Sequence, residues 1–107
     1  MNERLTTAEV LQKLRKELPY LRERYGVERI AIYGSFATGK PTKKSNIDLL
    51  VELVQPLGLD FIALAYHLEE VLGRKVDLAT FDTLRKSMEN PRYKHIVADI
   101  QRMLAYV

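Results

Sequence analysis

Residues 34–53 read GSFATGKPTKKSNIDLLVEL, and this stretch decides the fold. It opens on a glycine-serine turn, Gly34-Ser35, and ends in the run Ile47 to Leu53, whose alternation is typical of a half-buried strand. A short apolar stretch from Arg29 to Tyr33 precedes the turn and predicts another strand. Two strands therefore flank a glycine turn and the lysine-containing loop that follows it.

Helical patterns surround this pair of strands. Thr6 and Glu9 form a capping-box pattern that predicts a helix from about residue 7 to about residue 24, with a kink or break near Leu18 because Pro19 follows. Further helices are expected from about residue 61 to 72, through Leu84 and Met88, and from the Asn90-Pro91 pair to the end of the chain. A third strand is expected over residues 75–80.

The order α-β-β-α-β-α-α predicts an α+β fold, or α/β in a looser nomenclature. We expect a small mixed β-sheet with helices packed on one side. With 107 residues, the chain has the length of one compact domain, so residues 1–107 are predicted to form a single domain.

Composition narrows the functional classes. Hydrophobic residues make up 47% and charged residues 29%, which is ordinary for a soluble globular protein, and the absence of cysteine excludes disulfides and thiolate metal sites. No apolar run is long enough to span a bilayer, so we expect a cytoplasmic protein without a membrane partner. The net charge of +3 is compatible with nucleotide phosphates, nucleic acid or an acidic protein, and selects none of them.

Three polar residues carry the candidate chemistry. Asn46 and Asp48 are two positions apart at the start of a strand and should point to the same face, where they can hold a divalent cation. Asp77 interrupts the apolar run of another strand in the same manner. Gly34 and Ser35 can bring backbone N–H groups to a phosphate, and the lysines of the loop can meet a triphosphate or a charged partner; these are Lys40, Lys43 and Lys44.

Simpler interpretations remain open for each of these residues. The glycine-serine pair can be an ordinary strand-ending turn, and Asn46 a turn residue. The two aspartates can be capping or salt-bridged residues, and the lysines can belong to a solvated loop. His67 and His95 are interpreted as plain helix residues because neither has a partner at ligand spacing, so neither is included in the site.

The spacing of these residues resembles that of a known family, the minimal nucleotidyltransferases of the DNA polymerase β-like superfamily. These are small proteins encoded beside HEPN-domain proteins. Their pattern is Gly-Ser, about ten residues, Asp-x-Asp on the next strand and a third Asp on a later strand. Here the matching positions are Gly34, Ser35, Asn46, Asp48 and Asp77, and the resemblance covers almost the whole chain.

The resemblance implies an antitoxin-like enzyme that transfers AMP from ATP to a tyrosine of a cognate HEPN ribonuclease toxin. It implies two Mg²⁺ ions held at positions 46, 48 and 77, outer phosphates held by Gly34 and Ser35, and Asp77 as the base. The implied partners are ATP and the toxin, and the chain and the toxin could form a hetero-oligomer. Nucleic acid is not an expected partner.

Two positions depart from the family pattern. Asn46 replaces a metal-binding aspartate, and Thr38 stands where many members have arginine before Gly39. An amide oxygen can ligate a cation but brings no negative charge, so we expect a loss of roughly 2 to 4 kcal/mol in metal affinity or transition-state stabilisation. Activity is therefore expected to be impaired by Asn46.

Two alternative functions follow from the same residues. A catalytically inactive antitoxin that only binds and blocks its toxin is consistent with Asn46. Nucleotidyl transfer to a small hydroxylated molecule or to RNA is the other alternative, although the chain is too short to supply a second domain that would enclose such an acceptor.

Overall fold

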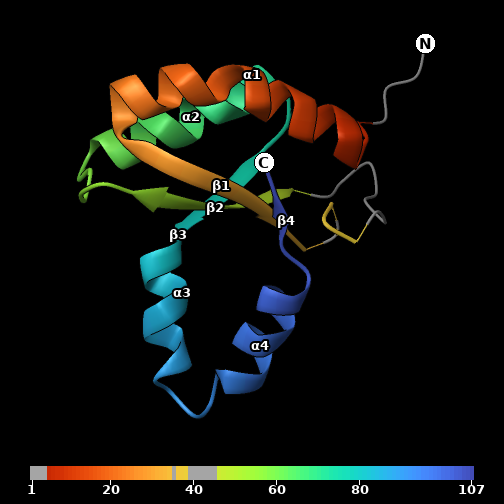
Figure 1. Ribbon diagram of the computed structural model, residues 1–107, viewed down its shortest axis with the longest axis vertical. Helices are drawn as coiled ribbons and strands as arrows, with labels where there is room; N and C mark the ends of the chain where they lie inside the picture. Colours follow the sequence, from red (N-terminus) through yellow and green to blue (C-terminus); the bar gives the residue numbers. More distant parts are fainter. Residues whose placement is uncertain (1–4, 35, 39–45) are drawn as a thin grey trace.

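The computed structural model describes residues 5–34, 36–38 and 46–107. The strands lie in the middle of the molecule and the helices lie around them (Figure 1). The elements are α1 (Thr7–Tyr25), β1 (Val27–Tyr33), β2 (Ile47–Leu53), α2 (Asp60–Leu72), β3 (Val76–Thr80), α3 (Phe81–Met88), α4 (Lys94–Arg102) and β4 (Ala105–Tyr106). The predicted α+β fold with a small mixed sheet is confirmed.

The sheet has the strand order β3-β2-β1-β4. β2 runs antiparallel to β1 and parallel to β3, and α2 makes the crossover that a parallel pair needs. β4 pairs antiparallel with the other side of β1. β2 is therefore held on both sides, with Ile47 beside Val76 and Ile32 beside Leu49.

α1 begins and ends as the sequence predicts. The Thr6 side chain accepts the backbone N–H of Glu9, the Glu9 side chain accepts the backbone N–H of Thr6, and Gly26 closes the helix in the left-handed conformation. Of the two outcomes predicted near Leu18, the break is wrong, because the helix continues through Pro19, and the kink stays a prediction. Leu14 and Leu21 are fully buried on either side of the proline, and this packing favours one continuous helix despite the missing N–H.

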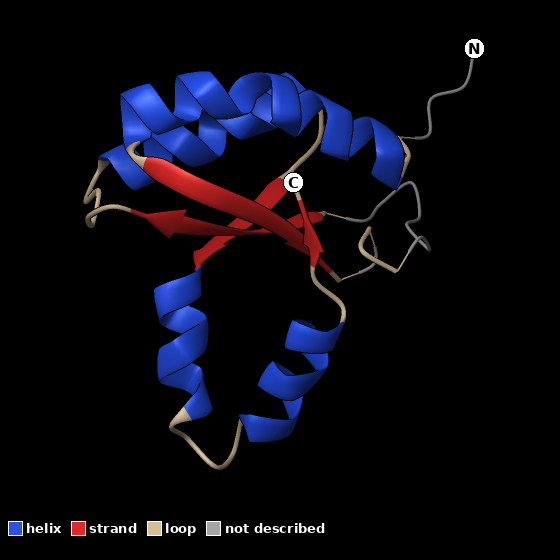
Figure 2. Cartoon of the chain, viewed as in Figure 1, coloured by secondary structure: helices blue, strands red, loops and turns tan. Residues whose placement is uncertain are grey.

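Helices cover both faces of the sheet, which corrects the expectation that they lie on one side. α1 and α2 lie on one face, and α3 and α4 lie on the other (Figure 2). The reason is visible in β1 and β2, where Ala31 and Leu50 are buried on the face opposite to that of Ile32 and Leu49. Central strands that are apolar on both faces need cover on both.

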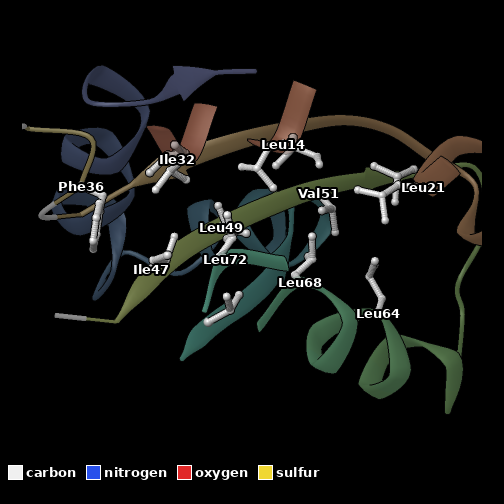
Figure 3. Close-up of a cluster of buried hydrophobic side chains, with 14 of the residues drawn as sticks. Leu14, Leu21, Ile32, Phe36, Ile47, Leu49, Val51, Leu64, Leu68 and Leu72 are labelled. Atoms are coloured by element: carbon white, nitrogen blue, oxygen red, sulfur yellow. The ribbon is translucent and has the colours of Figure 1, made fainter. Parts of the chain in front are cut away.

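The larger core lies between the sheet and the α1–α2 layer. Leu14 and Leu21 from α1 and Leu64 and Leu68 from α2 meet the strand side chains, and Phe36 closes the end of this core nearest the glycine turn (Figure 3). A smaller cluster on the other face contains Ala31, Leu50, Phe81, Leu84 and Val97. Phe36 thus anchors the segment after Gly34 to the larger core.

The C-terminal segment differs from its prediction at both ends. α4 begins at Lys94 instead of Pro91, because residues 91–93 form a turn in which the Asn90 side chain accepts the N–H of Arg92. The helix ends at Arg102, and the last residues form β4, whose pairing is extended by a bond from Val107 N–H to the Ile30 carbonyl. The expected terminal helix is wrong there because pairing along β1 satisfies backbone groups that its edge would otherwise expose.

Among the described residues, no helix combines the length and the apolar character needed to cross a membrane. The longest, α1, carries charged residues along its exposed face.

The core predicts a sharp contrast between two positions of α2. Leu64 is fully buried and Ile62 is 52% exposed on the same helix. Leu64→Ala should lower the free energy of unfolding by about 3 kcal/mol because it leaves a cavity. Ile62→Ala should change it by less than about 1 kcal/mol. Urea denaturation of both variants measures the difference, and equal losses would contradict the assigned core.

Candidate functional site

Two carboxylates lie side by side on adjacent parallel strands. Asp48 of β2 is in register with Asp77 of β3, and on its other side with Tyr33 of β1. Side chains in register share a face of the sheet, so these three residues form one row across three strands. The row lies on the face that α3 and α4 cover, since Leu50, two residues beyond Asp48, packs in their cluster.

Asn46 completes the cluster from the residue before β2. It is exposed, and its Nδ2 donates a hydrogen bond to Asp77 Oδ2 at 3.2 Å. The structure therefore brings Asn46, Asp48 and Asp77 together, as the sequence suggested, while their roles stay predictions. Asn46 acts here as a donor that orients the Asp77 carboxylate, which an aspartate at this position cannot do in its ionised form.

The electrostatics of the row favour a positive charge. Burial, the charge of Asp77 and a hydrogen bond shared with Asp77 together raise the pKa of Asp48 from 3.8 to about 6. Burial and the charges of Asp48 and Asp77 also raise the pKa of the Tyr33 hydroxyl. A bound cation would relieve this repulsion and keep Asp48 ionised.

The donor set fits a hard divalent cation. Carboxylate oxygens and an amide oxygen are ligands that Mg²⁺ accepts, with water completing the shell. Within the described residues no group of three or more histidine, cysteine, aspartate or glutamate side chains could hold a metal. Among the described residues, the candidate ligands at this point are the two carboxylates and the neighbouring Asn46 amide.

Gly34 lies close to the carboxylate of Asp48. Its φ of +72° lies in the left-handed region, and a Cβ at this position would be 2.3 Å from Asp48 Oδ2. The Gly34 carbonyl accepts N–H groups of Ala37 and Thr38, which closes a tight turn above the buried Phe36. Glycine is therefore required both by the backbone conformation and by the proximity of the carboxylate.

Other predicted residues fall in different places. Ser35, Lys40, Lys43 and Lys44 lie outside the described residues. His67 lies between α1 and α2, where its Nε2 is 2.7 Å from Glu17 Oε1, and His95 is exposed on α4.

Tyr33 and a neighbouring pocket were missed by sequence reasoning. Tyr33 was interpreted only as the end of a strand, although pairing it with Asp48 would have placed it on the carboxylate face. The pocket has a volume of about 190 Å³ and lies between this face, α3 and α4. It could not be found from the sequence, because the helices on this face were expected on the other.

Comparison with known proteins identifies the family. Residues 11–102 match the nucleotidyltransferase domain family. This chain belongs to that family. The resemblance noted from the sequence is thereby confirmed at the family level, and the chain is a nucleotidyltransferase.

Two archaeal relatives extend the match. The chain is 37% identical over 105 residues to a Methanocaldococcus jannaschii protein provisionally named protein adenylyltransferase MJ1379, covering 95% of this chain and 98% of that protein. It is 34% identical over 94 residues to the protein adenylyltransferase MntA of Thermococcus cleftensis, covering 87% of this chain and 95% of the relative.

Solved structures share the fold. One, provisionally described as a minimal nucleotidyltransferase, has a TM-score of 0.70 and 28% identity and covers 97% of this chain and 98% of that one. Another, a toxin-antitoxin structure with AMP-PNP, has a TM-score of 0.52 and 27% identity and covers 76% of this chain and 59% of that one. The minimal nucleotidyltransferase fold is therefore shared over almost the whole chain.

Substitution of Gly34 should cost more than substitution of a glycine with the same backbone but open surroundings. Gly73 has a φ of +68° and no atom within 4 Å of an added Cβ. Gly73→Ala should lose about 1 to 2 kcal/mol of unfolding free energy from strain alone. Gly34→Ala should lose at least about 1 kcal/mol more because Asp48 must move. Thermal unfolding of both variants measures this, and equal losses would argue against the close contact.

The raised pKa of Asp48 predicts a pH-dependent stability in metal-free buffer. Between pH 3.8 and about 6 the folded state keeps a proton that the unfolded state has released, so the free energy of unfolding falls as pH rises through this window. The full shift corresponds to about 3 kcal/mol, and because Asp48 is half-buried, solvent screening should leave about 1 kcal/mol.

Asp48→Asn should remove this decline. Urea unfolding at pH 4 and pH 7 in the presence of a chelator measures the difference between variant and parent, which should grow with pH. A difference that stays constant across the window would contradict the assigned interaction.

Proposed function

We propose that this nucleotidyltransferase is an antitoxin-like protein adenylyltransferase that transfers AMP from ATP to a tyrosine of a HEPN-domain toxin. The observation that carries the proposal is the pair of adjacent carboxylates, Asp48 and Asp77, beside the left-handed Gly34. Relatives named protein adenylyltransferase support the reaction, and the toxin-antitoxin structure with AMP-PNP supports the partner and the nucleotide. The HEPN toxin and its tyrosine come from the family resemblance.

Divalent metal, with two Mg²⁺ ions proposed, would be held by Asp48, Asp77 and Asn46. When bound, such ions supply neutralisation of charge on the phosphates and activation of the attacking oxygen. The turn at Gly34 and Ser35 would hold the outer phosphates through backbone N–H groups. Asp48 lies between Gly34 and Asp77, and this position supports a role in orienting the α-phosphate.

We propose Asp77 as the base that accepts the proton of the incoming hydroxyl. It is exposed on β3 at the edge of the sheet, so the hydroxyl of a protein acceptor can approach it from solvent. The new bond joins the tyrosine oxygen to the α-phosphorus, the bond to the β-phosphate oxygen breaks, and pyrophosphate leaves. The tyrosine proton passes to the Asp77 carboxylate.

We propose that residues 1–107 act as one domain in the cytoplasm, where ATP is present. The two apolar clusters of the described residues share one sheet, which is consistent with a single domain.

Asn46 sets the rate of the proposed reaction. Asn46→Asp adds a carboxylate beside Asp77 and should increase AMP transfer about 30- to 1,000-fold, with tighter Mg·ATP binding. Calorimetric titration of Mg·ATP and intact-mass analysis of the partner after incubation with ATP and Mg²⁺ measure both effects. Asp77→Asn is the matched control and should abolish transfer. A partner that stays unmodified by Asn46→Asp at saturating metal would contradict the proposed function.

A binding-only antitoxin is the second candidate, and the hydrogen bond from Asn46 to Asp77 favours it. Asn46 occupies one oxygen of Asp77 through its amide N–H and brings no charge to the metal site. This alternative predicts inhibition of the toxin without ATP. Measuring toxin activity with and without nucleotide separates the two, because strict dependence on ATP supports the enzyme.

A further inference from the structure

We propose that the pocket between the sheet, α3 and α4 binds the base of the nucleotide, an inference that rests on the proposed function. The pocket has a volume of about 190 Å³. Its sheet wall includes Tyr33, Leu50 and Ala79, and its helix wall includes Thr83 from α3 and Ile96 from α4. None of the candidate metal ligands lines it.

The pocket lies next to the carboxylate row, on the same face of the sheet. Leu50 and Ala79 are in register with each other and follow Asp48 and Asp77 by two residues on the same face. Two residues along a strand span roughly 6.6 to 6.8 Å. The glycine turn lies beyond the other end of the carboxylate row, after Tyr33. Turn, carboxylates and pocket therefore follow one another along the strands.

This order matches the order of groups in a nucleoside triphosphate. With the outer phosphates at the turn and the α-phosphate at the carboxylates, the nucleoside should extend along the strands, away from the turn. In that direction it passes over Leu50 and Ala79 and reaches the pocket. The two residues of strand between the carboxylate row and the pocket cover a length that a ribose can bridge. The pocket thus lies within reach of a base whose phosphates occupy the proposed site.

The size and lining of the pocket suit a single flat ring system. Sites for whole drug-sized ligands are roughly 300 to 1,000 Å³, so about 190 Å³ is too small for a nucleotide and sufficient for its base. Ile96 is 57% exposed and Tyr93 is 44% exposed, and both present apolar surface at the pocket on which a base can stack. Ser87 donates its hydroxyl proton to the Thr83 carbonyl, which leaves its oxygen able to accept from a base amine.

The acceptor side chain has a different route. Asp77, the proposed base, is exposed on the edge strand β3, whereas the pocket lies beneath α3 and α4 on the inner part of the same face. A macromolecular acceptor can reach Asp77 at that edge without displacing either helix. The pocket between α3, α4 and the sheet is therefore assigned to the small substrate.

Two probes separate the base from the phosphates. α,β-Methylene-ATP with Mg²⁺ carries both, and tripolyphosphate with Mg²⁺ carries phosphates alone. In ¹H–¹³C NMR spectra the methyl signals of Ala79 and Ile96 should shift with the first probe and not with the second, while the Ile62 methyl on α2 shifts with neither. Equal shifts of the pocket methyls with both probes, or no shift with α,β-methylene-ATP when calorimetry shows that it is bound, would overturn the inference.

Filling the pocket gives the matched binding test. Ala79→Leu should weaken binding of α,β-methylene-ATP at least tenfold by calorimetry and leave tripolyphosphate binding within twofold. Ala63→Leu, at an exposed alanine of α2, should change neither. Ile96→Ala removes part of the pocket wall and adds no side-chain bulk. It should weaken binding of the nucleotide analogue several-fold, which provides a test if Ala79→Leu does not fold.

The outcomes distinguish this inference from the proposed function. Unchanged affinity of Ala79→Leu and Ile96→Ala for the analogue would overturn the pocket assignment and leave the proposed reaction intact. If these variants bind the analogue normally but no longer modify the partner, the pocket receives the acceptor side chain and the inference is wrong. If the parent chain binds neither probe, the proposed function itself fails.

Discussion

The parallel pairing of β2 with β3 is the constraint on which the site depends. It places the half-buried Asp48 beside the exposed Asp77, so that the fold holds two like charges together. Such a pair is unfavourable without a cation, so the apolar packing on both faces of β2 must supply the energy that keeps it in place. The repulsion between the two carboxylates is thus offset by the apolar packing of β2, the strand that carries Asp48.

Much of this arrangement could be predicted from local sequence. The capping box of α1, the run Ile47 to Leu53, and the spacing from Gly34 to Asp48 depend on neighbours in the chain, and each predicts its element correctly. That Asp77 lies beside Asp48 could only be expected, because the order of strands in a sheet depends on long-range contacts that local sequence patterns do not show.

The errors share a physical cause. Pro19 is tolerated, Leu50 is buried and residues 105–106 form a strand because tertiary packing overrides local preference at those places. Alternation in β2 suggested that one face was polar, yet Leu50 belongs to the second cluster. The pocket and Tyr33, the neighbour of the carboxylates, lie on that same face, and so both were missed together.

The two apolar clusters also differ in size, and this difference has a consequence for motion. Among the described residues, five buried side chains make up the cluster under α3 and α4, whereas the opposite cluster draws on two long helices and the main strands. Regions with fewer buried contacts open locally at lower free energy than the rest of a domain. The α3–α4 arm is thus the segment whose amides should exchange with solvent first, and its transient opening would admit and release a ligand while the sheet stays folded.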